Sequence, residues 1–402
     1  MAEPAGDAPA GAVPVPVFDG HNDVLTRLLM AGGTGAADAF LTGLPLHLDL
    51  PRARRGGFAG GLFALWVPSS AATGADGERA GKGGAGAPAR GAAPGAATAS
   101  AAGDGEDYQR RMEAPAYDLP LPPPLERATA TDVVMHEIAI LLRLEAIGAL
   151  RICTDVAAIR RAMADGAIAA VLHLEGAEAI DPELHALDVL HRAGLRSLGP
   201  VWSRDTAFGH GVPFRFPSGP DIGPGLTDAG RRLVRRCNEL GVLVDLSHLN
   251  ERGFDDVAAL SDAPLVATHS NAHARCPHAR NLTDRQLDAI AASGGLVGLN
   301  FATAFLREDG RMSADTPVAT MLGHLDALLE RLGERGVALG SDFDGAVVPR
   351  AIGDASGLQV LVEAMRAHGY SEALVARICH GNWLDLLERT WKPVSGRDAG
   401  TA

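Results

Sequence analysis

The sequence contains few cysteines and an excess of negative charge. Its four cysteines are widely separated and include no C-x-x-C pair: Cys153, Cys237, Cys276 and Cys379. We therefore expect neither a disulfide framework nor a structural zinc knuckle. Lysine and arginine total 36 against 49 acidic residues, which gives a formal net charge of −13. Because nucleic-acid binding requires a basic face, this charge argues against nucleic acid as a partner.

The sequence also lacks a long hydrophobic run. No stretch approaches the ~18 consecutive apolar residues that a transmembrane helix requires. The first residues, MAEPAGDAPAGAVPVP, contain no basic region followed by an apolar stretch, so no signal peptide is expected. The last residues, SGRDAGTA, carry no hydrophobic anchor signal. We therefore predict a cytoplasmic protein without a membrane partner.

What the sequence does contain is an alternation of short apolar runs with longer amphipathic segments. Two such segments, LTDAGRRLVRRCNELG and LTDRQLDAIAASGG, open with a threonine suited to an N-cap and close at glycine. Apolar strands spaced by helices indicate a parallel sheet covered by helices. An open doubly wound sheet would also fit, but eight strands favour a closed (β/α)8 TIM-type barrel. The candidate strands are Val15–Asp23, Gly61–Val67, Ile168–Leu174, Leu195–Trp202, Val242–Ser247, Leu265–Thr268, Leu296–Asn300 and Val337–Ser341.

One segment interrupts this pattern. Residues 69–107 contain no Leu, Ile, Val, Met or aromatic residue. Such a composition cannot bury enough apolar area to offset the entropy of ordering, so we predict a disordered Ala/Gly-rich loop insertion after the second strand. The predicted organisation is one barrel domain over residues 15–390, with flexible tails over residues 1–14 and 391–402.

Several candidate strands end in residues that can bind a metal ion. In a barrel, functional side chains lie where the strands end, at the C-terminal face. The first, third, fifth, sixth and eighth strands end in such residues: His21 and Asp23, Glu175, His248, His269 and Asp342. His21 and Asp23 are two residues apart on one strand and therefore point to the same side. Glu175 follows an apolar run, where a carboxylate is costly to bury unless it is paired or binds a metal.

Each of these residues has a simpler interpretation on its own. An HxD pair is weak evidence for a metal, Glu175 could favour a helix start, and a single histidine after a strand is more often a core or loop residue. Independent loop residues would rarely end five strands in this way, so the set as a whole predicts a metal centre. His173, two residues before Glu175, could share its side and is assigned to the surroundings of that centre.

The donor atoms indicate which metal is expected. Histidine nitrogens and carboxylate oxygens together suit zinc, with Mn²⁺, Co²⁺ or Fe²⁺ as substitutes. Five ligands with Glu175 between two ions would hold a pair ~3.5–4 Å apart that shares a water molecule. Such a site can lower the pKa of the water from ~15.7 towards ~7. We therefore predict two Zn²⁺ ions per chain.

These residues lie in motifs that resemble the membrane (renal) dipeptidase family, zinc metallopeptidases of the amidohydrolase-like barrel group. The matching motifs are DGHND, HLEG, VDLSH, GSDFDG and the long HSNAHARCPHARNLTDRQLDAIAASGGLVGLNF. They extend from about Val17 to Leu387, which leaves out only the tails and the Ala/Gly-rich segment. The resemblance implies a barrel enzyme that hydrolyses dipeptides, and it suggests a homodimer.

The resemblance also implies roles for individual residues. His21 and Asp23 would ligate one zinc ion, His248 and His269 would ligate the other, and Glu175 would bridge both.

Two further positions match residues that act on the substrate. Arg280 lies where the family grips the substrate's carboxylate, a task that suits the forked donors of a guanidinium. Asp342 lies where the family has its acid/base carboxylate. Asp344 is so close in sequence that the choice between the two aspartates stays open.

The sequence departs from the family after the fourth strand. A histidine that contacts the substrate there is replaced, in LGPVWSRDTAFGHG, by Trp202. Tryptophan cannot accept a proton and offers a single N–H donor, so Trp202 is expected to form part of the pocket wall. Arg204 or His210 could supply the missing positive group, and His210 is assigned to the substrate site.

The expected function is hydrolysis of a small dipeptide by a hydroxide that bridges the metals, with Glu175 and Asp342 as the catalytic residues. Two alternatives stay open. The altered segment at Trp202 would suit another small amide, such as a lactam, a cyclic amide or an N-acyl amino acid. A barrel of another functional class could bind the metals without catalysis.

Overall fold

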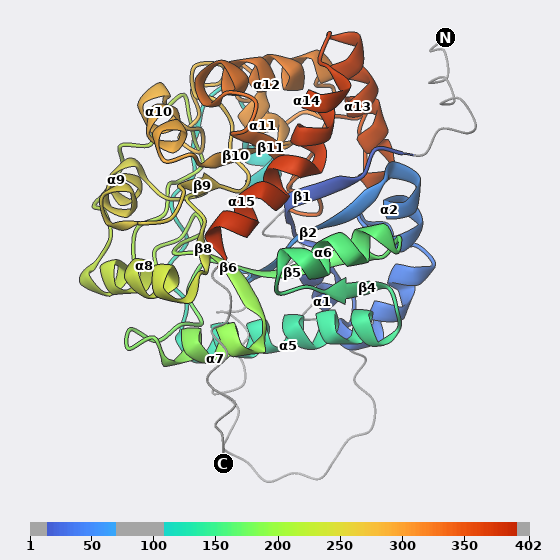
Figure 1. Ribbon diagram of the computed structural model, residues 1–402. Coiled ribbons are helices and arrows are strands. Elements are labelled where there is room, and N and C mark those ends of the chain that lie inside the picture. Colours follow the sequence, from blue (N-terminus) through green and yellow to red (C-terminus); the bar gives the residue numbers. More distant parts are fainter. Residues whose placement is uncertain (1–13, 70–107, 392–402) are drawn as a thin grey trace, which may run out of the picture.

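The computed structural model describes residues 14–69 and 108–391, which are arranged around a ring of parallel strands (Figure 1). Five of the strands pair in the order β1-β2-β5-β6-β8 and three in the order β9-β10-β11. Two parallel bridges, between Asn22 and Phe343 and between Asp245 and Val266, join these two sheets at both edges. The predicted (β/α)8 barrel is therefore confirmed. Its strands are β1 (Val17–Asn22), β2 (Phe58–Trp66), β5 (Ile168–Glu175), β6 (Leu195–Gly199), β8 (Leu243–Val244), β9 (Val266–Ala267), β10 (Leu296–Asn300) and β11 (Val337–Gly340).

Three short strands lie beside the barrel and were not predicted. Strand β4 (Leu150–Ile152) pairs in parallel with the first half of β5, whereas β6 pairs with its second half. Strands β3 (Tyr117–Asp118) and β7 (Arg215–Phe216) form an antiparallel pair. Each is only two or three residues long, too short to leave a period in the sequence.

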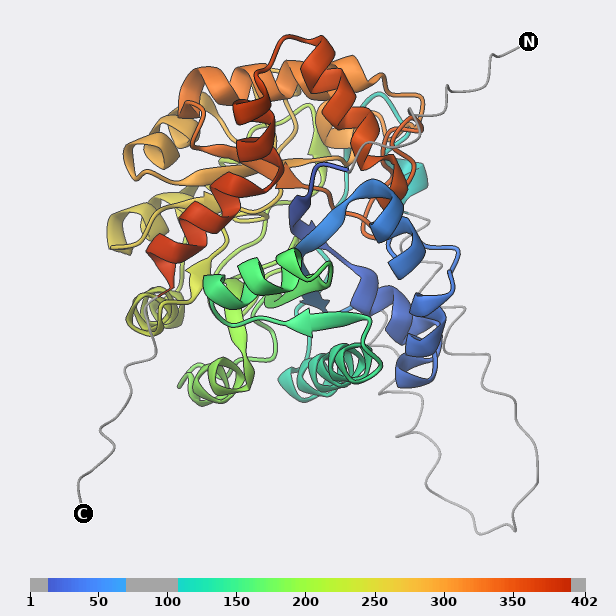
Figure 2. The ribbon, with the colours of Figure 1, turned by 45° about the vertical axis from the view of Figure 1, so that its right-hand side comes forward.

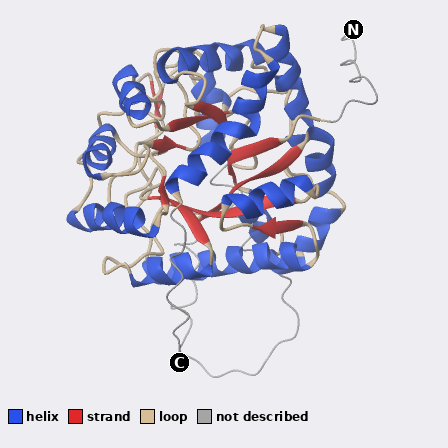
Figure 3. Cartoon of the chain, in the orientation of Figure 1, coloured by secondary structure: helices blue, strands red, loops and turns tan. Residues whose placement is uncertain are grey.

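Helices surround the strands, as Figures 2 and 3 show. In the part of the chain that the structure describes, none of them is both long enough and apolar enough to cross a bilayer. The helices are α1 (Val24–Met30), α2 (Leu50–Gly56), α5 (Arg127–Ala146), α6 (Val156–Ala164), α7 (His185–Ala193), α8 (Asp228–Leu240), α9 (Glu251–Leu260), α10 (Asp284–Ala292), α11 (Thr303–Leu306), α12 (Val318–Leu332), α13 (Leu358–Ala367), α14 (Glu372–Ala376) and α15 (Asn382–Thr390).

The two predicted threonine caps begin helices as expected. The hydroxyl of Thr227 accepts a hydrogen bond from the backbone N–H of Gly230 at the start of α8. Helix α8 then ends at Gly241, whose φ of 70° is the left-handed conformation that glycine adopts most easily. At α10, Thr283 and Gln286 cap each other's backbone in a capping box. These caps explain why both helices begin where they do.

The N-terminal end of the barrel is filled by one tryptophan. Trp383, on helix α15, is fully buried, and its indole N–H donates to the carbonyl oxygen of Leu339 at 2.9 Å. Helix α15 crosses this end of the barrel in Figure 1. Gly20 leaves room for the ring, because a Cβ there would collide with it. The side chains clustered with Trp383 come from almost every strand: Phe18, Leu62, Val171, Leu243, Val266, Leu296 and Ala338.

Only Leu296–Asn300 keeps its predicted limits, and the other seven strands begin or end at different residues. The largest reduction is in the fifth strand, which shrinks from Val242–Ser247 to Leu243–Val244. The fourth strand was predicted to run to Trp202, but β6 ends at Gly199 because Pro200 has no N–H to continue the ladder. Trp202 therefore lies in the following loop. The third strand extends one residue further than predicted and includes Glu175.

The predicted insertion beyond Ser69 and most of both predicted tails fall outside the described residues, so these domain limits stay predictions.

The packing of Trp383 leads to a testable prediction about stability. Replacing Trp383 with alanine should lower the free energy of unfolding by about 3–5 kcal/mol, because it leaves a cavity and an unpaired carbonyl. Urea unfolding followed by circular dichroism measures this change. Leu142→Ala, at a side chain that is 53% exposed, serves as the control and should change stability by less than about 0.5 kcal/mol. Equal losses in both variants would contradict the role given to Trp383.

Candidate metal centre and active site

Five predicted ligands meet at the C-terminal end of the barrel. Glu175 lies at the centre of the group, at the last position of β5. One of its carboxylate oxygens is 3.0 Å from Nε2 of His248 and 3.5 Å from Nε2 of His269. The other is 3.4 Å from Nε2 of His21, which is itself 3.5 Å from the carboxylate of Asp23. One oxygen of Glu175 thus faces His21, which is near Asp23, and the other faces His248 and His269.

Ring orientation in this group is fixed by neighbouring polar residues. Nδ1 of His248 lies 2.8 Å from the hydroxyl of Ser203. Nδ1 of His269 lies 2.8 Å from the hydroxyl of Thr268, which donates in turn to Asp245 at 2.6 Å. With Nδ1 engaged, Nε2 of each ring is directed towards Glu175. Such outer contacts are the usual means of fixing the orientation of a metal-binding histidine.

The backbone at this end of the barrel is strained. Among the described residues, four that are not glycine have a positive φ, and three of them lie here: His248 (67°), Asp342 (58°) and Asp344 (71°). A side chain in this conformation costs about 1–3 kcal/mol and persists only where the surrounding structure imposes it. At these residues the position of the side chain is therefore maintained at a cost in backbone conformational energy.

The charges of the group favour a bound cation. Burial lowers the pKa of His21, but the nearby carboxylates of Glu175 and Asp23 outweigh burial and raise it well above its usual value. Burial raises the pKa of Glu175 and of Asp342, and the charge of Asp23 adds to both shifts. Three neighbouring carboxylates, two of them buried and that of Asp342 partly exposed, thus compete for positive charge, which either a proton or a metal ion can supply.

The two remaining histidines have the opposite shift. Burial lowers the pKa of His248 and of His269 well below the usual value, and the charge of Arg280 lowers both further. They are therefore neutral at pH 7, which is the form that binds a metal.

The residues present fit a metal ion. Within the described part of the chain, both ring nitrogens of His21 are buried without a hydrogen-bond partner. Two groups of possible ligands include His21, and within each group the donor atoms all lie within 4.8 Å of one another. One group adds Glu175 and His269, and the other adds Asp23 and Asp342. Imidazole nitrogen and carboxylate oxygen are donors that zinc accepts. The centre therefore satisfies, in donor type and position, the requirement of a metal site.

Asp342 and Asp344 have different surroundings. The carboxylate of Asp342 belongs to the donor group of His21 and accepts a hydrogen bond from the side-chain amide of Asn300 at 2.9 Å. The carboxylate of Asp344 accepts the backbone N–H groups of His47 and Leu48 at 2.7 and 3.2 Å. Asp344 thus holds a neighbouring loop, whereas Asp342 faces the centre.

A cavity of about 300 Å³ opens beside these residues. Asp23, Glu175, His248 and Asp342 contribute polar groups to its lining. The cavity is also lined by five aromatic and three methionine side chains: Trp66, Tyr108, Trp202, Phe214, Phe305, Met30, Met112 and Met312. The ring of Trp202 lies 5.1 Å from that of Trp66 and 5.8 Å from that of His248, measured between centroids. Trp202 is therefore part of the cavity wall, in the position expected of it.

The other predicted substrate residues do not line this cavity. Arg280 is buried behind His269, and its guanidinium donates to the carbonyl oxygen of His269 and to the hydroxyl of Ser270, both at 3.0 Å. His210 lies 3.1 Å from the carboxylate of Asp205, away from the cavity. Its contact with substrate stays a prediction.

The guanidinium of Arg204 is also engaged by other residues of the chain. It is fully buried, forms an ion pair with Glu178 at 2.8 Å and donates to the carbonyl oxygen of Val67. Arg204 thus secures the end of β2. Its guanidinium lies over the ring of Trp202, 5.2 Å from the centroid, but is already engaged by Glu178 and does not line the cavity.

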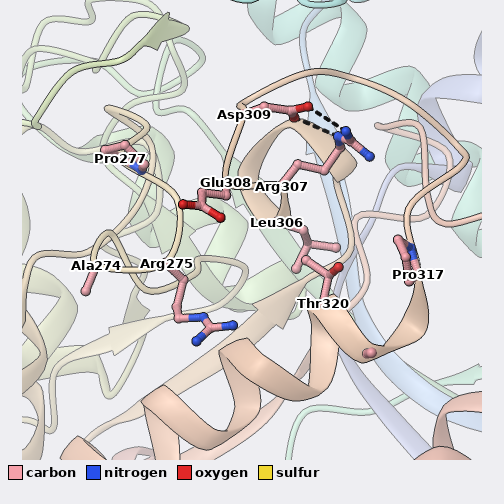
Figure 4. Close-up of a pocket in the computed structure, with 10 residues that line it drawn as sticks. Ala274, Arg275, Pro277, Leu306, Arg307, Glu308, Asp309, Pro317 and Thr320 are labelled. Atoms are coloured by element: carbon pink, nitrogen blue, oxygen red, sulfur yellow. Dashed lines mark hydrogen bonds and ion pairs between the residues drawn. The ribbon is translucent and has the colours of Figure 1, made fainter.

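A larger cavity, of about 1090 Å³, lies elsewhere and is shown in Figure 4. Its charged side chains include Arg275 and Glu308, and Arg307 is bonded to Asp309. No histidine is among the described residues that line it. Among the described residues, both donor groups that could hold a metal ion include His21, and each contains a carboxylate that lines the smaller cavity.

Sequence reasoning missed two residues that shape the centre. Asp245 accepts hydrogen bonds from Thr268, and its carboxylate lies 3.6 Å from His173. Its signal was present, because a carboxylate in the apolar run VLVDLSH requires a buried partner. Gly345 had no such signal. A Cβ at Gly345 would collide with the carboxylates of Asp23 and Asp342, so only glycine lets the two approach each other.

Comparison with known proteins places these observations in a family. A model of the membrane dipeptidase family, peptidase family M19, matches residues 12–394. An uncharacterized protein in the PQQ-III 3' region of Acinetobacter calcoaceticus is 37% identical over 320 residues, which cover 79% of this chain and 90% of that protein. An uncharacterized protein in the pqqA 5' region of Klebsiella pneumoniae is 48% identical over 263 residues, 65% of this chain and 97% of that protein.

Solved structures agree with this match. A metallopeptidase from Rhodobacter sphaeroides, liganded with a phosphinate mimic of the dipeptide L-Ala-D-Ala, is 52% identical with a TM-score of 0.83. The match covers 94% of this chain and all of that one. The dipeptidase AC, a metallopeptidase of family M19, is 51% identical with a TM-score of 0.83, over 94% of this chain and 99% of that one. The chain therefore belongs to the membrane dipeptidase family, peptidase family M19, and is a metallopeptidase that hydrolyses peptide bonds.

Proposed function

We propose that this protein is a zinc-dependent dipeptidase that uses two Zn²⁺ ions. The observation that carries the proposal is the position of Glu175, whose two carboxylate oxygens face different candidate ligands at one end of a cavity. The similar Rhodobacter sphaeroides enzyme was crystallised with a mimic of a dipeptide. Both observations support a small peptide as the substrate.

Each ion has its own ligands in this proposal. His21 and Asp23 would hold one ion, His248 and His269 would hold the other, and Glu175 would be shared between them. Bound zinc ions supply a hydroxide at neutral pH and polarise the scissile carbonyl. Manganese, cobalt or iron could take the same ligands.

Asp342 is the proposed acid/base residue. Its carboxylate lies among the donors of His21 and Asp23, so it can take a proton from the attacking water and deliver it to the leaving amine. The amide of Asn300 holds the carboxylate in place at 2.9 Å. Burial raises the pKa of Asp342, which helps it to carry that proton. A centre with metals of purely structural function would not need such a residue.

Arg280 is proposed to attract the C-terminal carboxylate of the substrate. Its guanidinium is buried, and its charge acts on Asp342, Asp245 and Glu175. A positive charge fixed near the metal centre favours short substrates, because the C-terminal carboxylate of a longer peptide would lie too far from the scissile bond to meet it. The proposed partner is therefore a small dipeptide-like molecule, and assembly as a homodimer stays part of the proposal.

One observation favours a second candidate substrate. Arg204 lies over the ring of Trp202, but it is held by Glu178 and Val67 and is not among the residues that line the cavity, so it does not take the place of the family histidine. The more apolar wall that results would also accept a lactam, a cyclic amide or an N-acyl amino acid.

A substrate panel distinguishes the two candidates. Purified enzyme with zinc is expected to hydrolyse L-Xaa–L-Xaa or L-Xaa–D-Xaa dipeptides with a higher kcat/KM than N-acyl amino acids or lactams. Release of free amino acid measures each rate. Turnover of an N-acyl substrate without turnover of any dipeptide would favour the second candidate.

Removal of metal should abolish activity and weaken the fold. Dialysis against a chelator is expected to remove about two zinc ions per chain, measured by elemental analysis, and added zinc should restore hydrolysis. The metal-free protein should also melt at a lower temperature, because a ligand that binds only the folded state stabilises it. Full activity after complete removal of metal would refute the proposal.

A pair of variants tests the choice between the two aspartates. Asp342→Asn should lower kcat by about 100-fold or more with zinc still bound, because the amide cannot transfer the proton. Asp344→Asn should instead lower the melting temperature, because it weakens the contacts with the loop at His47, and should affect kcat far less. Steady-state kinetics, zinc analysis and thermal melting of both variants provide the comparison. The reverse pattern would assign the acid/base role to Asp344.

A further inference from the structure

The charged side chains that line the active-site cavity include one arginine. Four carboxylates face the cavity, those of Asp23, Glu175, Asp342 and Asp344. Arg27 is the sole lysine or arginine among the described residues that line it. Neither the metal centre nor the acid/base step proposed above uses Arg27. Its position in the cavity therefore requires a separate explanation.

Arg27 is held in place from one side. It lies on α1, the helix that directly follows the metal-binding end of β1, and Asp23, Thr26 and Met30 of the same segment also line the cavity. Its Nε donates to the backbone carbonyl oxygen of Asp344 at 2.8 Å. This bond fixes the plane of the guanidinium and leaves its two terminal nitrogens for other partners. Within the described residues, no carboxylate forms an ion pair with them.

The nearest candidate partner is already engaged. The charge of Arg27 acts on Asp344, but both carboxylate oxygens of Asp344 accept backbone N–H groups of the loop at His47 and Leu48. Arg27 is also only half-buried, so its terminal nitrogens can meet a molecule that enters the cavity. A planar pair of N–H donors is best matched by a carboxylate, which accepts two parallel hydrogen bonds.

The two arginines near the cavity act at different places. The positive charge of Arg280 interacts with Glu175 and contributes to lowering the pKa of His248 and of His269. The charge of Arg27 instead acts on Asp344 and on His47, whose backbone N–H donates to Asp344. A dipeptide with neutral side chains carries one carboxylate and can satisfy one arginine. A dipeptide with an acidic side chain carries two.

We propose that Arg27 is a specificity-determining residue that binds the side-chain carboxylate of dipeptides containing aspartate or glutamate. This inference rests on the proposed dipeptidase function and names a substrate class for it. Because a hydrogen bond to a charged group contributes about 1.5–3 kcal/mol, loss of this contact should reduce kcat/KM for acidic substrates by about 10- to 100-fold.

The test compares acidic dipeptides with their amide counterparts, which have nearly the same shape without the charge. The substrates are Ala–Asp against Ala–Asn and Asp–Ala against Asn–Ala, in the stereochemical form that the wild-type enzyme hydrolyses. The readout is the ratio of kcat/KM between the two members of each pair. Arg27→Gln should lower this ratio at least tenfold in one pair, and Arg27→Lys should give an intermediate ratio, since it keeps the charge without the fork.

Arg275→Gln provides the matched control, because it removes the same charge from an exposed arginine of the other cavity (Figure 4) and should leave both ratios unchanged. Unchanged ratios in Arg27→Gln, or an equal fall for acidic and neutral substrates, would overturn the inference. A ratio that falls equally in Arg275→Gln would do the same, because it would reflect net charge alone. Failure of the wild-type enzyme on all of these dipeptides would instead refute the proposed dipeptidase function.

Discussion

The structure depends on keeping several carboxylates side by side at one end of the barrel. Asp23, Glu175 and Asp342 come from three different strand ends, yet their charges act on one another and raise the pKa of both Glu175 and Asp342. Isolated in an apolar interior, such groups would take up protons or disrupt the fold. Positive charge between them removes that penalty, which is why a metal centre and this arrangement of acids belong together.

Packing in the rest of the barrel keeps these carboxylates together although their negative charges repel one another. Trp383 and the strand residues around it fill the opposite end, so the strands cannot shift to separate the charges. The backbone is left-handed at His248 and Asp342, in the loops that follow β8 and β11. Gly345 lets the carboxylates of Asp23 and Asp342 approach each other, since any side chain there would occupy the space between them. Stability from the core thus offsets local strain at the site.

Charge also organises the space that a substrate would enter. Candidate metal ligands and aromatic residues both line the cavity, and Trp202 lies next to His248. Arg280 lies behind His269, whereas Arg27 faces the cavity beside Asp344. An acidic protein with a net charge of −13 thus keeps two arginines near its centre. Such a distribution suits a small anionic or zwitterionic substrate, because each carboxylate can meet a fixed positive charge.

The sequence by itself determined the fold and the donor set. Apolar runs spaced by capped helices identified all eight barrel strands, and their polar end residues identified Glu175 and the three histidines, because strand ends in a barrel share one face. Tertiary structure alone decided the rest. The resemblance favoured Asp342 over Asp344 without excluding the second. The structure separates their surroundings, because the loop at His47 and Leu48 engages the carboxylate of Asp344, whereas that of Asp342 lies among the donors of His21. Likewise, Arg27 and Arg204 look alike in sequence, yet a buried glutamate engages Arg204, whereas Arg27 faces the cavity. These differences arise from contacts between residues far apart in the chain, and the periodicity of residues along the sequence cannot predict such contacts.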